Sequence, residues 1–183
     1  MPRFPQKYAE RVQRLRVPIG FLLLAAFAVL AHPAPESILA SLPIILVGLA
    51  TRAWAAGHLQ KNLTLADSGP YAYTRNPLYL GSFIVALGFA AAGASLILAG
   101  LFTAAFLGIY LPVMEREEEH LLKIFPAYPD YAARVPLLWP KLGPQGANSF
   151  SPAVYLQNQE YKAALGAVTG LAVLAVKFYW RAR

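Results

Sequence analysis

The sequence contains no cysteine and little charge. Of its 183 residues, only 14% are Asp, Glu, Lys or Arg, while 57% are hydrophobic. The absence of cysteine excludes disulfide bonds, thiolate metal sites and cysteine nucleophiles. So small a share of charge is too little to cover a soluble domain, and the mean hydropathy is +0.46. These proportions indicate an integral membrane protein.

Acidic residues and histidines are also scarce. Nine Asp and Glu stand against sixteen Lys and Arg, which gives a net charge of +7. Because the basic residues flank apolar segments, they fit anionic lipid headgroups better than a nucleic acid. His32, His58 and His120 are well separated in the sequence, so we expect no metal site. The predicted partner is therefore the lipid bilayer, and no nucleic-acid partner is expected.

Five apolar segments are candidates for membrane-spanning helices, which need about 20 residues each. They cover residues 17–31, 37–59, 78–92, 94–113 and 163–180. The basic stretch before the first segment also fits a signal peptide, but we interpret the segment as a retained helix. The third and fourth segments form a hairpin around Gly93. The third spans only roughly 22 Å, short of the ~30 Å hydrocarbon core, so neighbouring helices must shield it or it must begin within the headgroup layer.

The fold class predicted is thus an all-α integral membrane protein with about five transmembrane helices, forming one domain over residues 1–183. Five basic residues precede the first helix, and the segments 60–77 and 114–162 carry most of the others. The positive-inside rule predicts that the N-terminus and both of these segments are cytoplasmic. Lys177, Arg181 and Arg183 conflict with this orientation, because five crossings place them outside. We resolve the conflict either by an incomplete last crossing or by dominance of the early charges.

Two glutamates lie on or beside the apolar face of a helix that is expected over residues 114–134. Glu118 shares this face with Leu121, Leu122 and Phe125, and Glu117 lies on a neighbouring stripe. A carboxylate on an apolar face near a bilayer needs a cationic partner. Beyond this helix, residues 136–152 are expected to form a loop rich in Pro and Gly.

Arg75 is the natural partner. It lies in "GPYAYTRNPLYLG" (69–81), where Pro77 excludes Asn76 from the α conformation and begins the next helix. The residues alone also permit a simpler interpretation, in which Arg75 reaches a lipid phosphate beside interfacial tyrosines. Arg134 is a third charged element on the same side. Together these elements predict one polar pocket at the membrane surface, open to water and to lipid.

Two ordered motifs around the hairpin resemble the isoprenylcysteine carboxyl methyltransferase family, which is related to the membrane phospholipid N-methyltransferases. They are "SGPYAYTRNPLYLG" and "EREEEHLLKIFPAYPDYAARVP". The resemblance covers about residues 57–139, so the remaining segments, including a C-terminal helix at about 160–180, are matched only by hydropathy. It implies S-adenosylmethionine as methyl donor, held at the base of the hairpin.

The resemblance also implies roles for individual residues. The catalytic candidates are Arg75, Glu117, Glu118 and Arg134. The cofactor-binding candidates are Gly69, Tyr71, Asn76, Pro77, Tyr79, Gly81, Glu118, Tyr128 and Tyr131. The sequence departs from the family pattern in two places. Asn76 stands where the family has histidine. Phe125-Pro126 stands where the family has Phe-Gly, and the tyrosines that follow arrive one residue early.

The function implied is methyl transfer to a lipidic acceptor at the cytoplasmic face. A carboxylate acceptor of the prenylcysteine type needs Arg75 and Arg134 as clamps, whereas a lipid amine needs Glu117 or Glu118 to take a proton. The family name favours the carboxylate, and both remain open. Two further classes are an NADPH-dependent sterol-type reductase and a non-catalytic lipid-binding scaffold. Neither the oligomeric state nor the natural acceptor follows from the sequence.

Overall fold

The structure is a computed structural model that describes residues 4–141 and 149–181. These residues form helices and no strands, which confirms the predicted all-α class. The α-helices are α1 (Gln6–Leu30), α2 (Pro35–Ala56), α3 (Pro77–Ala92), α4 (Leu96–Ala105), α5 (Leu111–Ile124), α6 (Tyr128–Arg134), α7 (Pro152–Gln157) and α8 (Tyr161–Arg181). A 3₁₀ turn, η1 (Gly69–Ala72), precedes α3, and a π-helical turn, η2 (Phe106–Tyr110), joins α4 to α5.

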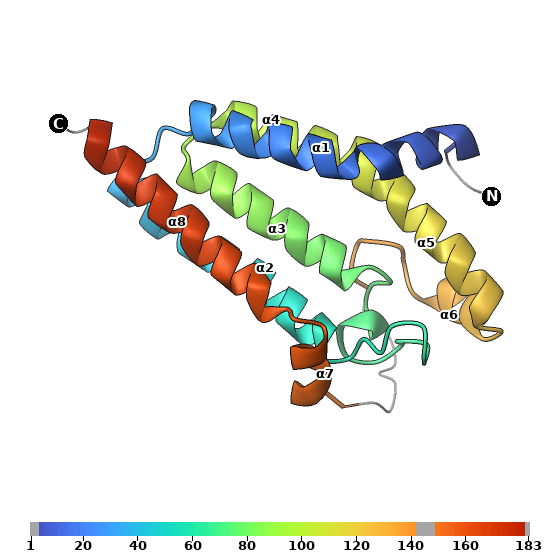
Figure 1. The fold of residues 1–183 in the computed structure, drawn as a ribbon. Coiled ribbons are helices and arrows are strands. Elements are labelled where there is room, and N and C mark those ends of the chain that lie inside the picture. Colours follow the sequence, from blue (N-terminus) through green and yellow to red (C-terminus); the bar gives the residue numbers. More distant parts are fainter. Residues whose placement is uncertain (1–3, 142–148, 182–183) are drawn as a thin grey trace.

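Four of the described helical segments are long and apolar enough to cross a membrane. They are Lys7–Leu30, Pro35–Ala56, Leu96–Ile124 and Tyr161–Arg181. The fifth predicted segment, α3, has only 16 residues and a length of about 24 Å. All five segments run lengthwise through the molecule, so the N- and C-terminal helix ends lie at opposite ends (Figure 1). The sequence therefore located the apolar segments correctly, and the short one is shielded by its neighbours.

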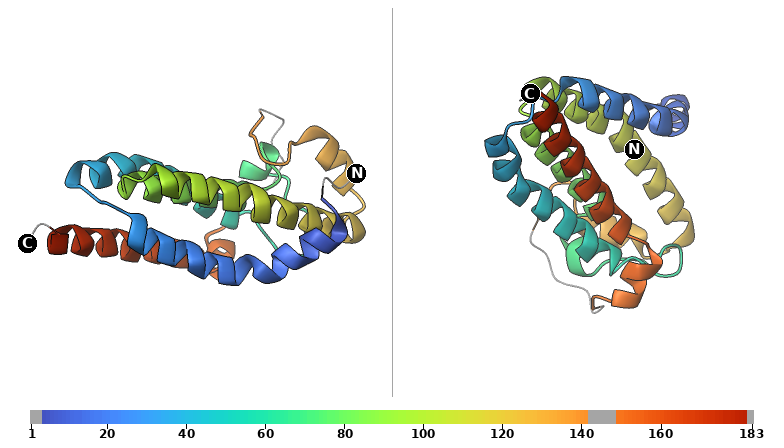
Figure 2. Two further views of the ribbon diagram at one scale, coloured as in Figure 1. Left: turned by 90° about the horizontal axis from the view of Figure 1, so that it is seen from above. Right: turned by 60° about the vertical axis from the view of Figure 1, so that its left-hand side comes forward.

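Glycines bring α2 and α3 into close contact, with α8 alongside α2 (Figures 1 and 2). A Cβ at Gly48 would lie 2.7 Å from the Val85 side chain and 2.8 Å from the Gly81 carbonyl oxygen. A Cβ at Gly88 would lie 2.6 Å from Ile45. In hydrocarbon, where the hydrophobic effect does not drive helices together, such small residues permit the close backbone approach that stabilises a helix pair.

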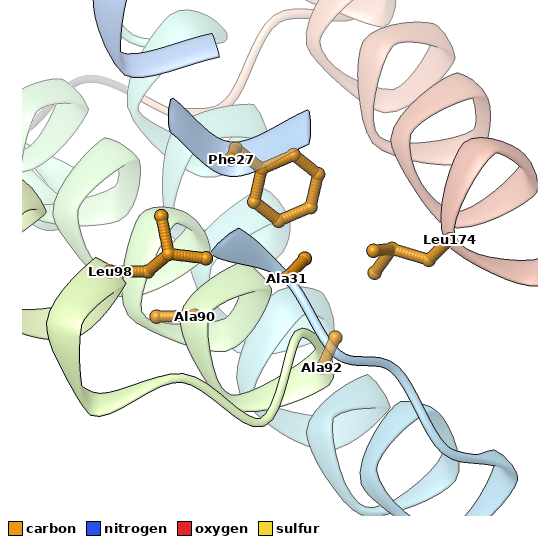
Figure 3. Packing of buried hydrophobic residues seen from close by; sticks show 6 residues of the cluster. All are labelled: Phe27, Ala31, Ala90, Ala92, Leu98 and Leu174. Atoms are coloured by element: carbon orange, nitrogen blue, oxygen red, sulfur yellow. The ribbon is translucent and has the colours of Figure 1, made fainter. Parts of the chain in front are cut away.

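At the end of the bundle remote from α6, small and large apolar residues form a compact core. Figure 3 shows this cluster, which joins α1, α3, α4 and α8: Phe27, Ala31, Ala90, Ala92, Leu98 and Leu174. Two hydrogen bonds close the hairpin turn against the α1–α2 link. The His32 N–H donates to the Gly93 carbonyl (2.7 Å), and the Ser37 hydroxyl donates to the Ala92 carbonyl (2.9 Å). The predicted hinge at Gly93 is confirmed.

The π-helical turn η2 has an identifiable cause. Pro112 has no N–H, so the Gly108 carbonyl loses its usual donor four residues later. The Tyr8 hydroxyl of α1 donates to that carbonyl instead, at 2.7 Å. This contact attaches the start of α1 to the end of the hairpin and leaves Tyr110 beside the cavity described below.

The expectation of one helix over residues 114–134 is wrong in one respect. The helix ends at Ile124, because Phe125 is extended (φ −121°, ψ 105°) and Pro126 follows. A separate helix, α6, then begins at Tyr128 with Pro129 in its first turn. The break turns α6 back toward the loop before α3 (Figure 1). The loop expected at 136–152 ends at Ser151, where α7 begins, and its residues 142–148 lie outside the described part of the chain.

The glycine contact between α2 and α3 predicts a strong effect of one methyl group. Gly48→Ala forces a Cβ against the α3 backbone and should lower the free energy of unfolding by about 1–3 kcal/mol. The control is Gly100→Ala, since nothing lies within 4 Å of a Cβ there. Alanine favours a helix over glycine by roughly 1 kcal/mol, so Gly100→Ala should be neutral or stabilising. Thermal unfolding in detergent compares the two variants, and equal midpoints would contradict the packing argument.

The basic segments predicted to be cytoplasmic lie at one end of the fold, which makes the orientation testable. Because the chain has no cysteine, single cysteines can be introduced without background. We expect Lys123→Cys, exposed near the end of α5, to react with a membrane-impermeant maleimide only from the cytoplasmic side. Glu36→Cys, exposed at the opposite end, should react only from the other side. The reverse labelling pattern would overturn the predicted orientation.

Candidate functional site

A cavity of about 690 Å³ lies where the loops and α6 meet the ends of the long helices. Its walls come from α1, the end of α2, the segment 59–66, the start of α3, α5 and α6. Pockets of this size hold small molecules of a few hundred daltons. Most of the residues expected at the site line it: Tyr71, Arg75, Asn76, Pro77, Tyr79, Glu117, Glu118, Tyr128 and Tyr131.

Glu118 is the centre of one polar cluster. Its Oε1 forms an ion pair with Nη1 of Arg75 and accepts a hydrogen bond from the Tyr128 hydroxyl at 2.9 Å. The side chains of Arg75 and Glu118 are only 16% and 19% exposed. The predicted partnership of Arg75 with a glutamate of the apolar face is therefore present. The buried Nε of Arg75 has no acceptor within the described residues, so this donor remains for a bound group or water.

Glu117 points to a different helix, as expected for the next residue along a helix. Its Oε1 accepts a hydrogen bond from the Tyr79 hydroxyl of α3 at 2.9 Å. The Tyr79 ring lies near that of Tyr110, with centroids 6.0 Å apart. The two adjacent glutamates thus line one cavity, and a different tyrosine fixes each of them.

The loop that carries Arg75 is held by the segment after α6. The Arg75 N–H donates to the Pro136 carbonyl (2.9 Å), and the Asn76 side-chain amide donates to the Leu137 carbonyl (3.1 Å). Asn76 is outside the α conformation (φ −128°, ψ 56°) because Pro77 follows it, as predicted. Asn76 therefore holds the two motif-bearing segments together and also lines the cavity.

Three buried tyrosines form the aromatic part of the wall. The Tyr131 hydroxyl donates to the Tyr71 carbonyl at 2.8 Å, and the Tyr128 and Tyr131 rings meet edge to face, 5.8 Å apart. Burial, then the charge of Glu118, raises the pKa of Tyr128 above its ordinary value. Burial, then the charge of Glu117, raises the pKa of Tyr71. Both hydroxyls consequently remain protonated donors at neutral pH.

Three of the predicted site residues do not line the cavity. Gly69 (φ +56°) places its backbone against the His58 ring, where a Cβ would be 2.6 Å from that ring. Gly81 faces α2, where a Cβ would be 2.6 Å from Cγ of Arg52. Arg134 donates from Nε to the Asp130 carbonyl at 3.3 Å on the exposed side of α6. Their geometry fits packing and helix termination, and their functional roles stay predictions.

Sequence reasoning missed Arg52, which lines the cavity from the last turns of α2. Its guanidinium forms an ion pair with Glu160, the residue before α8. Two signals for this pair were available in the sequence. Arg52 is charged within an apolar helix, and Glu160 is the single acidic residue after Asp130. An ionisable group at membrane depth generally has a partner.

The arrangement is suited to a positively charged organic group. Carboxylates and tyrosine rings both attract such a cation, and the charge on Glu117 is not neutralised by an ion pair within the described residues. Those residues contain no group of three His, Asp or Glu side chains that could hold a metal ion.

A family model matches the part of the chain that carries most of this site. Residues 39–128, just under half of the chain, match the family model described as phospholipid methyltransferase. This segment contains α3, both glutamates and most of the cavity wall. The match supports the broader group of membrane methyltransferases that the motifs indicated, without singling out the isoprenylcysteine carboxyl methyltransferases.

Two curated relatives are similar to part of this chain. One is the cobalt-zinc-cadmium resistance protein CzcN of Cupriavidus metallidurans, 37% identical over 57% of this chain and 50% of its own length. The other is the nickel-cobalt-cadmium resistance protein NccN of Alcaligenes xylosoxydans xylosoxydans, 38% identical over 50% of this chain and 44% of its own length. The chain thus spans about half the length of these relatives. No solved structure matches it.

The buried tyrosine beside Glu118 predicts a loss of stability at alkaline pH. Because the folded pKa of Tyr128 is raised, the native state keeps a proton that the unfolded state releases above about pH 10. Its contribution is complete below that pH and declines as the pH rises further. Tyr128→Phe should therefore show a shallower decline of the thermal midpoint above about pH 10 than the wild type. Tyr161→Phe, at a tyrosine that is 40% exposed, is the control, and parallel curves for wild type and Tyr128→Phe would contradict this origin.

Proposed function

We propose that this protein is a membrane methyltransferase that transfers a methyl group from S-adenosylmethionine to an amine of a lipid headgroup. One observation carries the proposal: two adjacent glutamates, each fixed by a tyrosine, line one cavity in the segment that matches the phospholipid methyltransferases. The cavity lies at an end of the long apolar helices, where a headgroup meets water.

The residues present fit S-adenosylmethionine. When bound, it supplies a methyl group on a positively charged sulfur. Glu117 and Glu118 provide negative charge, and the cavity-lining tyrosines provide aromatic faces, both of which favour a sulfonium. The volume of about 690 Å³ is adequate for the donor together with a headgroup. The unpaired Nε of Arg75 offers one further donor to a ligand carboxylate or hydroxyl.

The two glutamates differ in what they can do. Glu118 is neutralised by Arg75 and bonded by Tyr128, so its main contribution is to hold the wall in place. Glu117 has a hydroxyl partner and no ion pair within the described residues, while Arg16 lines the same cavity and acts on the same Tyr79 hydroxyl, so the Glu117 carboxylate is less fully neutralised than that of Glu118. An ammonium must lose a proton before its nitrogen can attack a methyl group. We assign Glu117 as the group that accepts this proton and passes it to water.

An amine acceptor fits the geometry better than the carboxylate favoured by the sequence. A carboxylate clamp requires both Arg75 and Arg134. Arg134 lies on the exposed side of α6, outside the cavity wall, so the second half of that clamp is not at the site. The description of the matching family also supports a phospholipid acceptor. Prenylcysteine O-methylation is therefore the alternative that the acceptor panel below tests.

The proposal predicts methyl transfer that depends on Glu117. Purified wild type should transfer label from S-[methyl-³H]adenosylmethionine to phosphatidylethanolamine in nanodiscs. Glu117→Gln should lower kcat by about 100-fold or more, since general base catalysis contributes roughly 10²–10⁴-fold. The matched control is Glu119→Gln on the same helix, outside the cavity, which should stay within about threefold of wild type.

Binding and acceptor panels decide between the alternatives. Label on N-acetyl-S-farnesylcysteine and none on amines would replace the amine with a carboxylate acceptor. Saturable binding of NADPH, with no binding of S-adenosylmethionine by equilibrium dialysis, would replace the transferase with a reductase. Unchanged turnover in Glu117→Gln would remove Glu117 from the mechanism.

A further inference from the structure

A second polar centre lies in the cavity wall, built partly from a segment outside the family match. The Arg52 Nε lies 2.6 Å from Oε1 of Glu160, and its Nη2 lies 3.0 Å from Oε2, so the two side chains meet in a two-pronged ion pair. The side chains are 24% and 10% exposed. Glu160 comes from the start of the C-terminal segment, whereas the family match ends at residue 128. The fork geometry fixes the plane of the guanidinium.

The remaining contacts of Arg52 tie it to the start of α3. Its Nη1 donates to the Leu78 carbonyl at 3.3 Å and to the Ser82 hydroxyl. A guanidinium has five N–H donors, and these contacts use four of them. The fifth, on Nη2, has no acceptor within the described residues, and Arg52 lines the cavity. Glu160 therefore holds Arg52 from the α8 side and leaves one donor uncommitted.

Tyr71 contributes a second donor nearby. It lines the same cavity as Arg52, and it belongs to η1, which packs against α2. The structure gives its hydroxyl no acceptor within the described residues. Burial keeps this hydroxyl protonated, because it raises the pKa of Tyr71. Two hydrogen-bond donors, one of them charged, are thus available on the same part of the wall.

The depth of Arg52 suits the phosphate of a lipid. It lies four residues before Ala56, the last residue of the membrane-spanning helix α2, or about 6 Å inside the helix end. Neighbouring side chains on α2 and α8, including Val47 and Leu165, are exposed and apolar, as on a surface that faces lipid. The Arg75–Glu118 centre, by contrast, is formed by the loop before α3, by α5 and by α6.

We propose that Arg52 and Tyr71 form an anion subsite that binds the phosphate of the lipid acceptor, with Glu160 as the residue that positions Arg52. This inference rests on the proposed function, and it assigns residues of this chain to the phosphate of the acceptor. The phosphate held by Arg52 leaves the headgroup amine to reach toward Glu117. The same two donors can also bind a carboxylate. The experiment below therefore distinguishes the phosphate of a lipid from the carboxylate of the methyl donor or of a farnesylcysteine.

Lipid binding without methyl donor tests the subsite directly. Detergent-solubilised protein is titrated with pyrene-labelled phosphatidylethanolamine, and binding is followed by energy transfer from tryptophan. Loss of one charge-assisted hydrogen bond predicts about 10-fold weaker binding for Arg52→Gln. The double variant Arg52→Gln/Glu160→Gln preserves neutrality, so it tests the same contact if the single variant fails to fold. Arg14→Gln, which removes an exposed charge of α1 outside the cavity, is the matched control.

The positioning role of Glu160 has its own readout. In methyl transfer, Glu160→Gln should raise KM for phosphatidylethanolamine by about three- to tenfold with little change in kcat, because it weakens the contact without touching the reacting atoms. Glu160→Asp, which keeps the charge, should partly restore KM. A purely structural role would instead lower the thermal midpoint and the active fraction, with KM unchanged.

The outcomes separate the inference from the function on which it rests. If Arg52→Gln binds lipid more weakly and its binding of S-adenosylmethionine in equilibrium dialysis is unchanged, the phosphate subsite is supported. Weaker binding of S-adenosylmethionine with unchanged lipid binding would reassign the subsite to the carboxylate of the donor and overturn our proposal. A loss of farnesylcysteine binding with unchanged phospholipid binding would also overturn our proposal. Wild-type methyl transfer with unaltered lipid binding in Arg52→Gln rejects the subsite alone, whereas absence of wild-type methyl transfer rejects the proposed function.

Discussion

The close approach of α2 and α3 is the constraint on which the site depends. Gly48 and Gly81 let the two backbones meet, since a Cβ at Gly48 would lie only 2.8 Å from the Gly81 carbonyl oxygen. That approach brings Arg52 of α2 against the first turns of α3, where it donates to the Leu78 carbonyl and to the Ser82 hydroxyl. It also supports an α3 too short to cross the membrane alone. Packing in the membrane and the geometry of the cavity wall therefore have one cause.

Local periodicity explains what the sequence predicted well. The paired glutamates followed from helix geometry, and the partnership of Arg75 with Glu118 followed from the cost of an unpaired charge near lipid. Arg134 was grouped with them because it lies on the same predicted side of the membrane and matches the arginine before Val-Pro in the resembled motif, but its direction depends on how α6 turns after Phe125. Arg52 and Glu160 are 108 positions apart, and no local pattern specifies that α2 and α8 lie side by side. Their partnership required the tertiary fold.

The departures from the family motif have structural consequences that the motif alone does not indicate. Pro126, in place of glycine, ends α5 and permits the compact turn into α6, so that the Tyr128 hydroxyl still reaches Glu118. Asn76, in place of histidine, donates to the Leu137 carbonyl and joins the two motif-bearing segments. An amide serves this structural purpose at any pH, whereas a histidine in its place titrates near neutrality. At this position the chain has a permanent donor where the resembled motif has a titratable group.

The charges around the cavity suggest why two neighbouring glutamates are needed. Arg75 neutralises Glu118, and Glu160 neutralises Arg52, so both pairs can be partly buried at moderate cost. Glu117 has no ion pair within the described residues; the Tyr79 hydroxyl bonds it and Arg16 acts on that same hydroxyl, so the negative charge at that point is only partly offset. Under the proposed function, a cationic donor and an ammonium acceptor are both attracted there, and the negative charge reduces their mutual repulsion. Substituting an arginine for Tyr79 would provide a stronger partner for Glu117 and remove the charge that makes this attraction possible.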